Sequence, residues 1–285
     1  MDKITVITVT FNAADTLEQA ILSVTGQTYP CTEFIIIDGK SQDGTVEIIK
    51  KYEDKLALWV SEKDNGIYDA MNKGIDKATG DRIIFLGADD CFSSPEILAT
   101  IFSSRDHSNV DVLYGNVQLS SSKKIFGGKK DYNKLLEQNI NHQAIFYKKS
   151  LFEKKGKFNT RYKVLADYHY NLELFRDDDI KKEYHPVTIT LFNDKGVSNN
   201  TIDKNFFNDM VTRLVDVEKM PPTTPAIQQY FFYEGFCELK DGKSKPGLKK
   251  ILQGVFYSKR KLFFFLVAVK FCLSFIGIGK KLNFK

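Results

Sequence analysis

Short apolar runs alternate with segments of helical periodicity over the first third of the chain. The apolar runs are rich in β-branched residues, as buried parallel strands are, and the segments between them carry apolar residues every three or four positions. The predicted strands cover 4–9, 34–37, 56–60 and 83–86, and the predicted helices cover 17–24, 46–52 and 67–78. This alternation predicts an α/β fold with a Rossmann-like, mixed but mostly parallel sheet flanked by helices on both faces.

The pattern changes near residue 111, where the predicted strands become shorter. Strands are expected at 112–119, 124–126, 142–147 and 187–192, with a helix at 167–176 and another beginning at 94–96. A proline-rich stretch at 221–225 cannot continue a helix and is taken as a domain boundary. We therefore expect a body of residues 1–220, with halves of about 1–115 and 116–220, and a carboxyl-terminal helical region of residues 221–285.

The carboxyl-terminal region contains two apolar helical patterns. The first places five apolar side chains on one face, as in an interfacial helix: Leu248, Ile251, Leu252, Val255 and Phe256. The second, 262–279, is apolar nearly all round but contains Lys270. Its length, about 27 Å, barely spans a bilayer core, and a central lysine costs about 2.5–3.5 kcal/mol there. A helix lying in the headgroup region is favoured over a spanning helix or a buried core helix.

Charge is divided unevenly along the chain. Eleven of the 41 Lys and Arg residues and none of the 36 Asp and Glu residues lie in 242–285, so this tail carries +11 and the preceding chain −6. Such a tail indicates an anionic partner, and its Phe-rich run at 263–267 favours an anionic membrane surface and predicts no nucleic acid. The four scattered cysteines and the absence of a secretory signal at Met1 lead us to expect a peripheral protein on the cytoplasmic face of the plasma (inner) membrane.

Two adjacent carboxylates, Asp89 and Asp90, follow the apolar run 82–86. Ligands of α/β sheets collect at the carboxyl ends of the strands. Carboxylate oxygens there suit Mn²⁺ or Mg²⁺ carrying a diphosphate. Capping of the next helix is the alternative role.

Polar groups also follow the other predicted strands. Phe11, at the end of the first strand, either stacks on a base or packs in the core. Asp38 either accepts hydrogen bonds from a ribose or uracil, or forms an Asx turn. The stretch 61–74 is dense in polar groups around a helix start, a place that suits phosphates.

Together these segments resemble the GT-A fold, family 2 inverting glycosyltransferases, particularly the bacterial members that build capsule, exopolysaccharide or O-antigen. The matching segments are 8–12, 36–45, 64–74, 86–90, 141–143 and 166–168, within about residues 4–197. The resemblance implies transfer of a sugar from a nucleotide diphosphate sugar, with UDP favoured, to a lipid-linked (polyprenyl diphosphate) saccharide. It also implies dependence on Mn²⁺ or Mg²⁺.

The resemblance further implies roles for individual residues. Nucleotide-sugar binding falls to Thr10, Phe11, Asn12, Asp38, Asp64, Asn72, Lys73, Ala88 and Asp89; metal binding to Asp89 with Asp90; general-base catalysis to Asp167; and contact with the acceptor or diphosphate to His142 and Gln143. The alternative role of Asp167 is that of a helix cap. His142 is alternatively a second base or a structural histidine. The first acidic position of the family's DxD motif is Gly87 in this chain.

Two other classes of function stay open. One is a catalytically inactive GT-A-like module that binds lipid or nucleic acid, motivated by Gly87 and the basic tail. The other is a dinucleotide-dependent dehydrogenase, which is disfavoured because residues 10–15 contain no Gly-x-Gly-x-x-Gly pattern.

Overall fold

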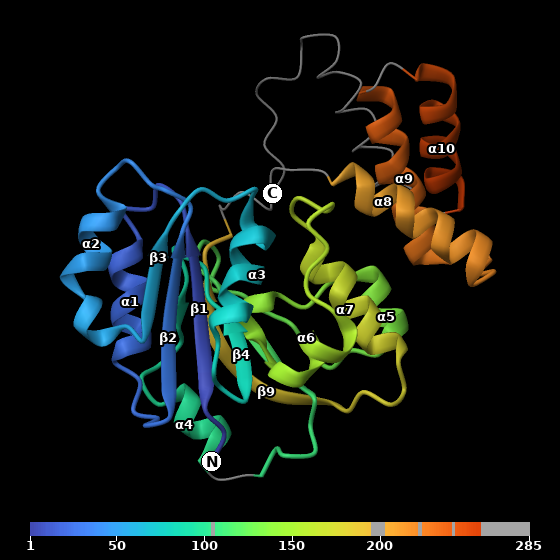
Figure 1. The fold of residues 1–285 in the computed structure, drawn as a ribbon. Coiled ribbons are helices and arrows are strands. Elements are labelled where there is room, and N and C mark those ends of the chain that lie inside the picture. The colour runs from blue at the N-terminus through green and yellow to red at the C-terminus, as the bar shows by residue number, and fades with distance from the viewer. Residues whose placement is uncertain (104–105, 195–202, 222–223, 241–242, 258–285) are drawn as a thin grey trace. The chain divides into compact units, whose positions relative to one another are not determined.

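The protein divides into two compact units, Met1–Thr201 and Ile202–Lys285 (Figure 1). The structure, a computed structural model, describes all residues except 104–105, 195–202, 222–223, 241–242 and 258–285. The division lies earlier than the boundary predicted at 221, because the segment that follows residue 203 packs with the carboxyl-terminal helices. Each unit is described by itself.

Unit 1 contains one mixed sheet covered by helices. Its strands are β1 (Ile4–Thr10), β2 (Thr32–Asp38), β3 (Leu58–Ser61), β4 (Arg82–Phe85), β5 (Cys91–Phe92), β6 (Val112–Leu119), β7 (Ile125–Phe126), β8 (Ile145–Lys148) and β9 (Lys182–Phe192). Its α-helices are α1 (Leu17–Thr25), α2 (Thr45–Lys51), α3 (Ile67–Lys77), α4 (Ile97–Phe102), α5 (Tyr132–Glu137), α6 (Lys149–Lys155) and α7 (Ala166–Arg176). Short 3₁₀ turns cover Glu53–Lys55 and His142–Ala144.

The strand order within the described residues is β3-β2-β1-β4-β8-β6-β9-β5, with β7 paired to β6. β1 pairs in parallel with β2 and β4, β2 with β3, and β6 with β9. The remaining pairs are antiparallel, and β8 runs against both β4 and β6. The first half of the sheet is parallel as predicted, whereas the second half is mixed.

The alternation of side chains along β1 separates two layers of core. Ile4 and Val6 pack in the cluster that contains the buried face of α1. The next position on the other face, Ile7, touches α3 so closely that a Cβ on Gly74 would lie 2.5 Å from its Cγ2 atom. Figure 1 accordingly shows α1 and α2 on one face of β1–β3 and α3 on the other. The sheet is therefore buried on both faces, which explains its continuous apolar runs.

An aromatic cluster fixes α7 beside the sheet. Phe85 of β4 packs against Phe158 with ring centroids 5.3 Å apart, and Phe152 of α6 stacks on Tyr170 of α7 at 5.1 Å. Phe158 also contacts Tyr170 at 5.4 Å and Tyr68 of α3 at 5.5 Å, so the cluster links α7 to α3. The helices α5 and α6 were not predicted from the sequence, and α4 begins at Ile97, just after the predicted start at 94–96.

Unit 2 consists of α8 (Lys204–Thr212), a π-helical turn (Arg213–Val217), α9 (Pro225–Lys240) and α10 (Ser244–Tyr257). Phe207 of α8 stacks on Tyr233 of α9 at 4.7 Å, which explains why α8 belongs to this unit. α9 and α10 approach closely at two glycines, since a Cβ on Gly235 would lie 2.7 Å from the Gly247 carbonyl oxygen.

The prediction for α10 needs correction in part. Ile251 is buried in the structure, whereas Leu248 and Leu252 are 50% and 57% exposed, so the three do not share one environment. Lys250 forms ion pairs with Glu234 at 2.6 Å and Glu238 at 2.9 Å. α10 thus uses one face to pack on α9. The side chains of residues 255 and 256 and the predicted apolar segment 262–279 lie outside the described residues.

None of the helices in the described part of the chain has the length and apolar character required to cross a bilayer.

Candidate active site

The carboxyl ends of β1, β2 and β4 meet at one edge of the sheet. Thr10 at the end of β1 is in register with Asp38 at the end of β2. β4 runs parallel to β1, and β8 runs antiparallel to β4, so the 3₁₀ turn that precedes β8 also reaches this edge. The predicted residues that follow β1, β2 and β4, and those of the turn before β8, are therefore brought to one side of unit 1, as the sequence analysis expected for a ligand site.

Phe11, Gly39 and Asp64 lie together at the β1–β2 side of this edge. Phe11 is 64% exposed, so it is not a core residue. A Cβ on Gly39 would lie 3.3 Å from the Phe11 ring and 2.5 Å from Asp64 Oδ2. Asp64 is held by the Gly66 N–H, which donates to its Oδ1 at 2.9 Å. An exposed ring and a carboxylate on either side of a bare glycine can accept a planar base and a hydroxyl or N–H donor.

Asp38 is fully buried and organises the loop that follows β2. Its Oδ2 accepts hydrogen bonds from the Lys40 and Ser41 N–H groups at 3.1 and 3.0 Å and from Ser61 Oγ at 2.6 Å, and its Oδ1 accepts one from Ser41 Oγ. Asn12 then joins the same loop, because its N–H donates to Ser41 Oγ at 2.8 Å. This geometry supports the turn-forming role, and direct contact of Asp38 with a nucleoside stays a prediction.

Thr10 and Ala88 are also buried, at 6% and 8% exposure. The Thr10 hydroxyl lies inside the protein without a hydrogen-bond partner among the described residues. Both side chains contribute to the wall of the site more than to its open surface.

The two adjacent carboxylates differ in their environments. Asp89 is exposed, and Asn193, just beyond β9, donates from Nδ2 to its Oδ2 at 3.0 Å. Asp90 is 1% exposed and accepts from Gln143 Nε2 at 2.9 Å and from the Asn193 N–H at 2.7 Å. Burial raises the pKa of Asp90 to about 6, although the hydrogen bond from Asn193 opposes that shift. Asp90 and Gln143 thus tie β4, β8 and β9 together, and the predicted metal contact of Asp90 receives no support.

Both carboxylates lie close to Gly87. A Cβ at this position would lie 2.5 Å from Asp90 Oδ2 and 3.0 Å from Asp89 Oδ1. The departure from an acidic residue at position 87 therefore has a packing cause, because the buried Asp90 carboxylate occupies that space. The exposed Asp89 carboxylate offers hard oxygen ligands, which suit a divalent cation that keeps open positions for phosphate oxygens.

Asp167 and His142 form a hydrogen-bonded pair. His142 Nδ1 lies 3.0 Å from Asp167 Oδ2, and Tyr68 of α3 donates its hydroxyl to Asp167 Oδ1 at 2.6 Å. Burial raises the pKa of Asp167, but the hydrogen bond and charge of His142 and the hydrogen bond from Tyr68 outweigh it, so the pKa is lowered. Asp167 is 5% exposed, whereas the His142 side chain is 20% exposed. The histidine is the member of the pair that solvent reaches.

Two predicted phosphate-binding residues are engaged elsewhere. Asn72 donates to the Phe158 carbonyl at 2.9 Å and accepts from the Phe158 N–H at 3.0 Å, so its amide fastens the loop after α6 to α3. Lys73 pairs with Glu62 at 2.8 Å and lies 3.7 Å from Asp69. The structure thus gives Asn72 a packing role.

Three residues of the site were not singled out from the sequence: Tyr68, Asn139 and Asn193. Asn139 donates to Asp167 Oδ2 at 3.3 Å. Tyr68 lies in the polar stretch 61–74 and Asn193 follows a predicted strand, so both lay near a signal. Only the paired strands and packed helices show that these side chains reach Asp167 and Asp89.

Comparison with known proteins identifies the family of the chain. The model of glycosyl transferase family 2 matches residues 5–182. A PGL/p-HBAD biosynthesis glycosyltransferase of Mycobacterium tuberculosis is 37% identical over 213 residues, covering 72% of this chain and 83% of the relative. Glycosyltransferase AglE of Haloferax volcanii is 31% identical over 122 residues, which is 41% of this chain and 40% of the relative.

Solved structures share the fold. Residues 1–349 of S. aureus TarS in complex with UDP-GlcNAc give a TM-score of 0.63 at 17% identity, covering 90% of this chain and 79% of that one. Mannosyltransferase PcManGT from Pyrobaculum calidifontis, in complex with GDP-Man and Mn²⁺, gives 0.56 at 18% identity, with 98% and 76% coverage.

The fold and the family match define a glycosyltransferase with a GT-A-like fold. The chain belongs to glycosyl transferase family 2.

Proposed function

We propose that the protein is an inverting glycosyltransferase that moves a sugar from a UDP-sugar to a lipid-linked saccharide during assembly of a cell-envelope glycan. One observation carries this proposal. Phe11 with Asp64, the exposed Asp89, and the His142–Asp167 pair come from separate parts of the chain and converge on one edge of the sheet.

The nucleoside is proposed to bind at the β1–β2 side of this edge. The exposed Phe11 ring offers a stacking surface, and Asp64 offers a carboxylate that accepts hydrogen bonds. Relatives of known structure bind UDP-GlcNAc or GDP-Man, which supports a nucleotide-sugar donor. UDP is our choice between these nucleotides.

Asp89 is proposed to hold the divalent cation, Mn²⁺ or Mg²⁺, with Asn193 orienting its carboxylate. When bound, such a cation neutralises the charge that develops on the leaving diphosphate. The surrounding residues keep Asp89 in place, because Asp90 anchors the same turn through Gln143 and the Asn193 N–H.

The His142–Asp167 pair is proposed to take the proton from the acceptor hydroxyl. Because Asp167 Oδ2 can only accept from Nδ1–H, the Nε2 atom of His142 carries the lone pair. As the hydroxyl oxygen forms its bond to the anomeric carbon, its proton passes to Nε2 and the bond from that carbon to the diphosphate oxygen breaks. Direct displacement inverts the configuration and releases UDP. Asp167 then acts on the histidine's orientation and charge, as a positioning residue.

The lipid-linked acceptor and a peripheral location on the cytoplasmic membrane face are proposed from the tail. Residues 242–285 carry eleven basic and no acidic residues. Leu248 and Leu252 are exposed on α10, and Lys249 beside them is exposed as well. The mycobacterial relatives act, by their names, in PGL/p-HBAD biosynthesis, which supports an envelope glycolipid as acceptor.

The experiment is release of UDP from a panel of UDP-sugars with Mn²⁺, with and without a polyprenyl diphosphate-linked saccharide. Asp89→Asn and Asp167→Asn should each lower turnover by about 10²- to 10⁴-fold. Asp177→Asn, at the far end of α7 where it pairs with Lys155 at 2.5 Å, is the matched control and should retain turnover. Full activity of the Asp167 variant would rule out the proposed His142–Asp167 pair, and absence of UDP release from every donor would favour the inactive module.

A further inference from the structure

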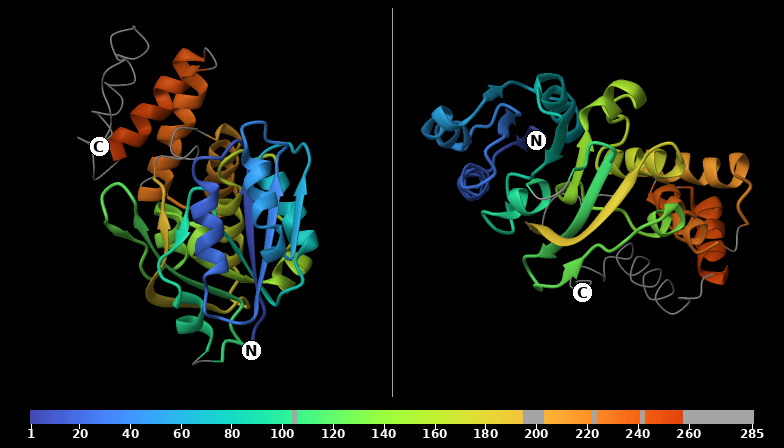
Figure 2. Two further views of the ribbon diagram at one scale, coloured as in Figure 1. Left: turned by 90° about the vertical axis from the view of Figure 1, so that its left-hand side faces the viewer. Right: turned by 90° about the horizontal axis from the view of Figure 1, so that it is seen from below.

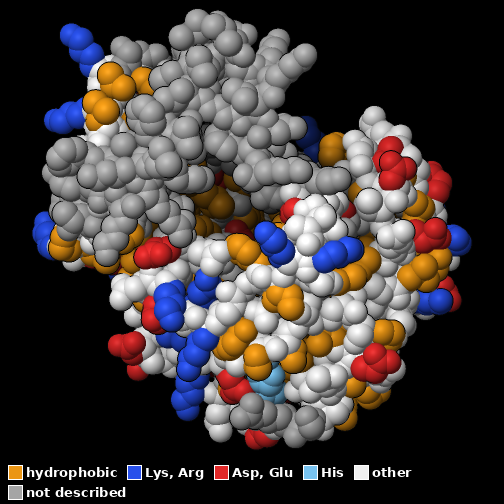
Figure 3. Space-filling view, turned by 180° about the vertical axis from the view of Figure 1, so that it is seen from behind, with side chains coloured by type: hydrophobic (Ala, Val, Ile, Leu, Met, Phe, Trp, Pro, Cys, Tyr) orange, Lys and Arg blue, Asp and Glu red, His pale blue; other side chains and the backbone are white. Residues whose placement is uncertain are grey.

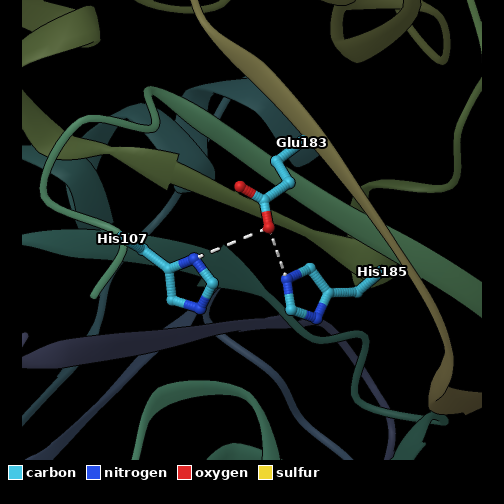
Figure 4. A group of neighbouring side chains, drawn as sticks. All are labelled: His107, Glu183 and His185. Atoms are coloured by element: carbon cyan, nitrogen blue, oxygen red, sulfur yellow. Dashed lines mark hydrogen bonds and ion pairs between the residues drawn. The ribbon is translucent and has the colours of Figure 1, made fainter. Parts of the chain in front are cut away.

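A second cluster of metal-ligating side chains lies far from the candidate active site. His107 follows α4, and Glu183 and His185 lie near the start of β9 on the same side of the strand (Figure 4). Asn193 follows the other end of β9, so the cluster is separated from Asp89 by about eight residues of strand, roughly 26 Å. Any ligand of this cluster is therefore distinct from the one at Asp89.

The three ligand atoms face one another. His185 Nε2 lies 2.9 Å from Glu183 Oε1, and His107 Nδ1 lies 3.9 Å from the same oxygen. Figure 4 shows the two imidazole rings on either side of this carboxylate. Ligands of a tetrahedral Zn²⁺ with bonds of about 2.0–2.1 Å lie about 3.3 Å apart. The three ligand atoms lie within 4.8 Å of one another, so adjustments of at most about 1.5 Å would complete the geometry.

The tautomer of His107 leaves its Nδ1 atom able to bind a metal ion. Its Nε2 atom lies 3.0 Å from the Ile101 carbonyl oxygen, which only accepts, so Nε2 carries the hydrogen in the neutral ring and Nδ1 carries the lone pair. That Nδ1 is buried with no hydrogen-bond partner among the described residues, and the residue is 3% exposed. A lone pair that points at a carboxylate oxygen is unfavourable unless a cation or proton lies between them.

The surroundings hold His107 in place in the manner of a metal site. Histidine ligands of metals usually donate the second ring N–H to a carbonyl or carboxylate, as His107 does to Ile101. The buried Arg82 donates from Nη2 to the carbonyl oxygens of His107 and Val110, which fixes the loop. The Glu183 side chain is 30% exposed, so an ion can enter from solvent. On the face drawn in Figure 3, histidine surface is visible next to acidic side chains.

We propose that His107, Glu183 and His185 bind one Zn²⁺ ion, with a water molecule in the fourth position, and that this ion fastens the loop after α4 to β9. Two imidazoles and one carboxylate favour Zn²⁺ over the hard cations Mg²⁺ and Mn²⁺, which prefer all-oxygen sites. The ion has a structural role, since the cluster lies at the opposite end of β9 from the candidate active site.

The experiment uses the full chain without a polyhistidine tag, stripped with a chelator. Titration calorimetry with ZnCl₂ should give one site per chain, and Tm should rise by about 5–10 °C at a hundredfold excess of Zn²⁺ over Kd. His185→Gln and Glu183→Gln should each weaken Zn²⁺ binding at least 100-fold. His169→Ala is the matched control, because His169 lies 3.9 Å from Glu173 and the described residues place no group of three metal-ligating side chains there; this variant should bind Zn²⁺ as the parent does.

Two measurements keep the test decisive. The Tm of each variant without metal shows whether it folds, and a tetrahedral Co²⁺ absorption spectrum of the unsubstituted protein reports the site without any variant. Asp89→Asn should retain Zn²⁺ binding, and His185→Gln should retain Mn²⁺-dependent UDP release. Absence of Zn²⁺ binding by the stripped protein, or binding that is unchanged in both cluster variants, would overturn the proposal.

Discussion

Substitution of Gly39 by alanine tests the proposed nucleoside site by adding one carbon atom, Cβ, next to Asp64. The new Cβ would lie 2.5 Å from Asp64 Oδ2, so the carboxylate would have to move by about 1 Å to reach an ordinary contact distance of about 3.5 Å. Gly39 is not among the residues with positive φ, so alanine is compatible with its backbone. We therefore expect a change in stability below about 1 kcal/mol.

The effect on nucleotide binding should be larger. Displacement of Asp64 removes a hydrogen bond to a charged acceptor, worth about 1.5–3 kcal/mol, which corresponds to a Kd for UDP about 10- to 150-fold weaker. Calorimetric titration of UDP in the presence of Mn²⁺ measures this directly. Circular dichroism and Tm of the variant serve as the control for folding.

A double-mutant cycle separates this cause from general disturbance of the loop. In the Asp64→Ala background the obstructed oxygen is absent, so Gly39→Ala should change Kd by less than about twofold. Unchanged UDP affinity of Gly39→Ala, or an equal loss of affinity in both backgrounds, would refute a nucleoside site between Phe11 and Asp64.

Three further substitutions test structural roles of residues in unit 1. Glu33→Gln should lower the free energy of unfolding by about 2 kcal/mol at pH 7. Burial raises the pKa of Glu33, but hydrogen bonds from two threonines and Lys3 lower it to about 2, so its stabilisation exists above pH 4.5 and is lost as pH falls towards 2. Denaturant titrations at pH 7 and 3 should thus show a smaller difference at pH 3. Gly87→Asp should cost about 1–3 kcal/mol in the same assay, because its side chain would overlap Asp90. Asn72→Ala should cost about 1–3 kcal/mol yet leave the Kd for UDP within twofold, and a selective loss of UDP binding would restore its predicted phosphate role.

The parallel half of the sheet could be predicted because its strands are buried on both faces. Such strands read as continuous apolar runs, and the polar residues directly after them mark the carboxyl edge. Phe11 and Asp89 were noted at such strand ends and Asp64 in the polar stretch 61–74, and the structure brings all three to that edge. Helices α5 and α6 were missed because each is short and offers few turns of periodicity.

The different environments of neighbouring residues could not be predicted from the sequence. Asp89 and Asp90 are equivalent in the sequence, but the chain after β9 covers one and leaves the other exposed. In the sequence Asp38 is compatible with a ligand contact or an Asx turn. The fold adds Ser61, 23 residues away, to the local donors Lys40 and Ser41 around its carboxylate. Burial and hydrogen-bond partners of this kind depend on tertiary packing.

The cluster of His107, Glu183 and His185 could not be predicted from the sequence for the same reason. Its only local signal is Glu183 and His185 two residues apart on a strand, where both side chains point to one side. His107 lies far away in the sequence, and pairing of β6 with β9 is what brings it near.

A crystal structure with UDP and Mn²⁺ tests the central claim most directly. We predict anomalous scattering from Mn²⁺ within about 2.0–2.3 Å of an Asp89 carboxylate oxygen, with the uracil ring against Phe11 and the diphosphate between the two. Nucleotide bound away from this edge of the sheet, or Mn²⁺ bound without contact to Asp89, would contradict the account.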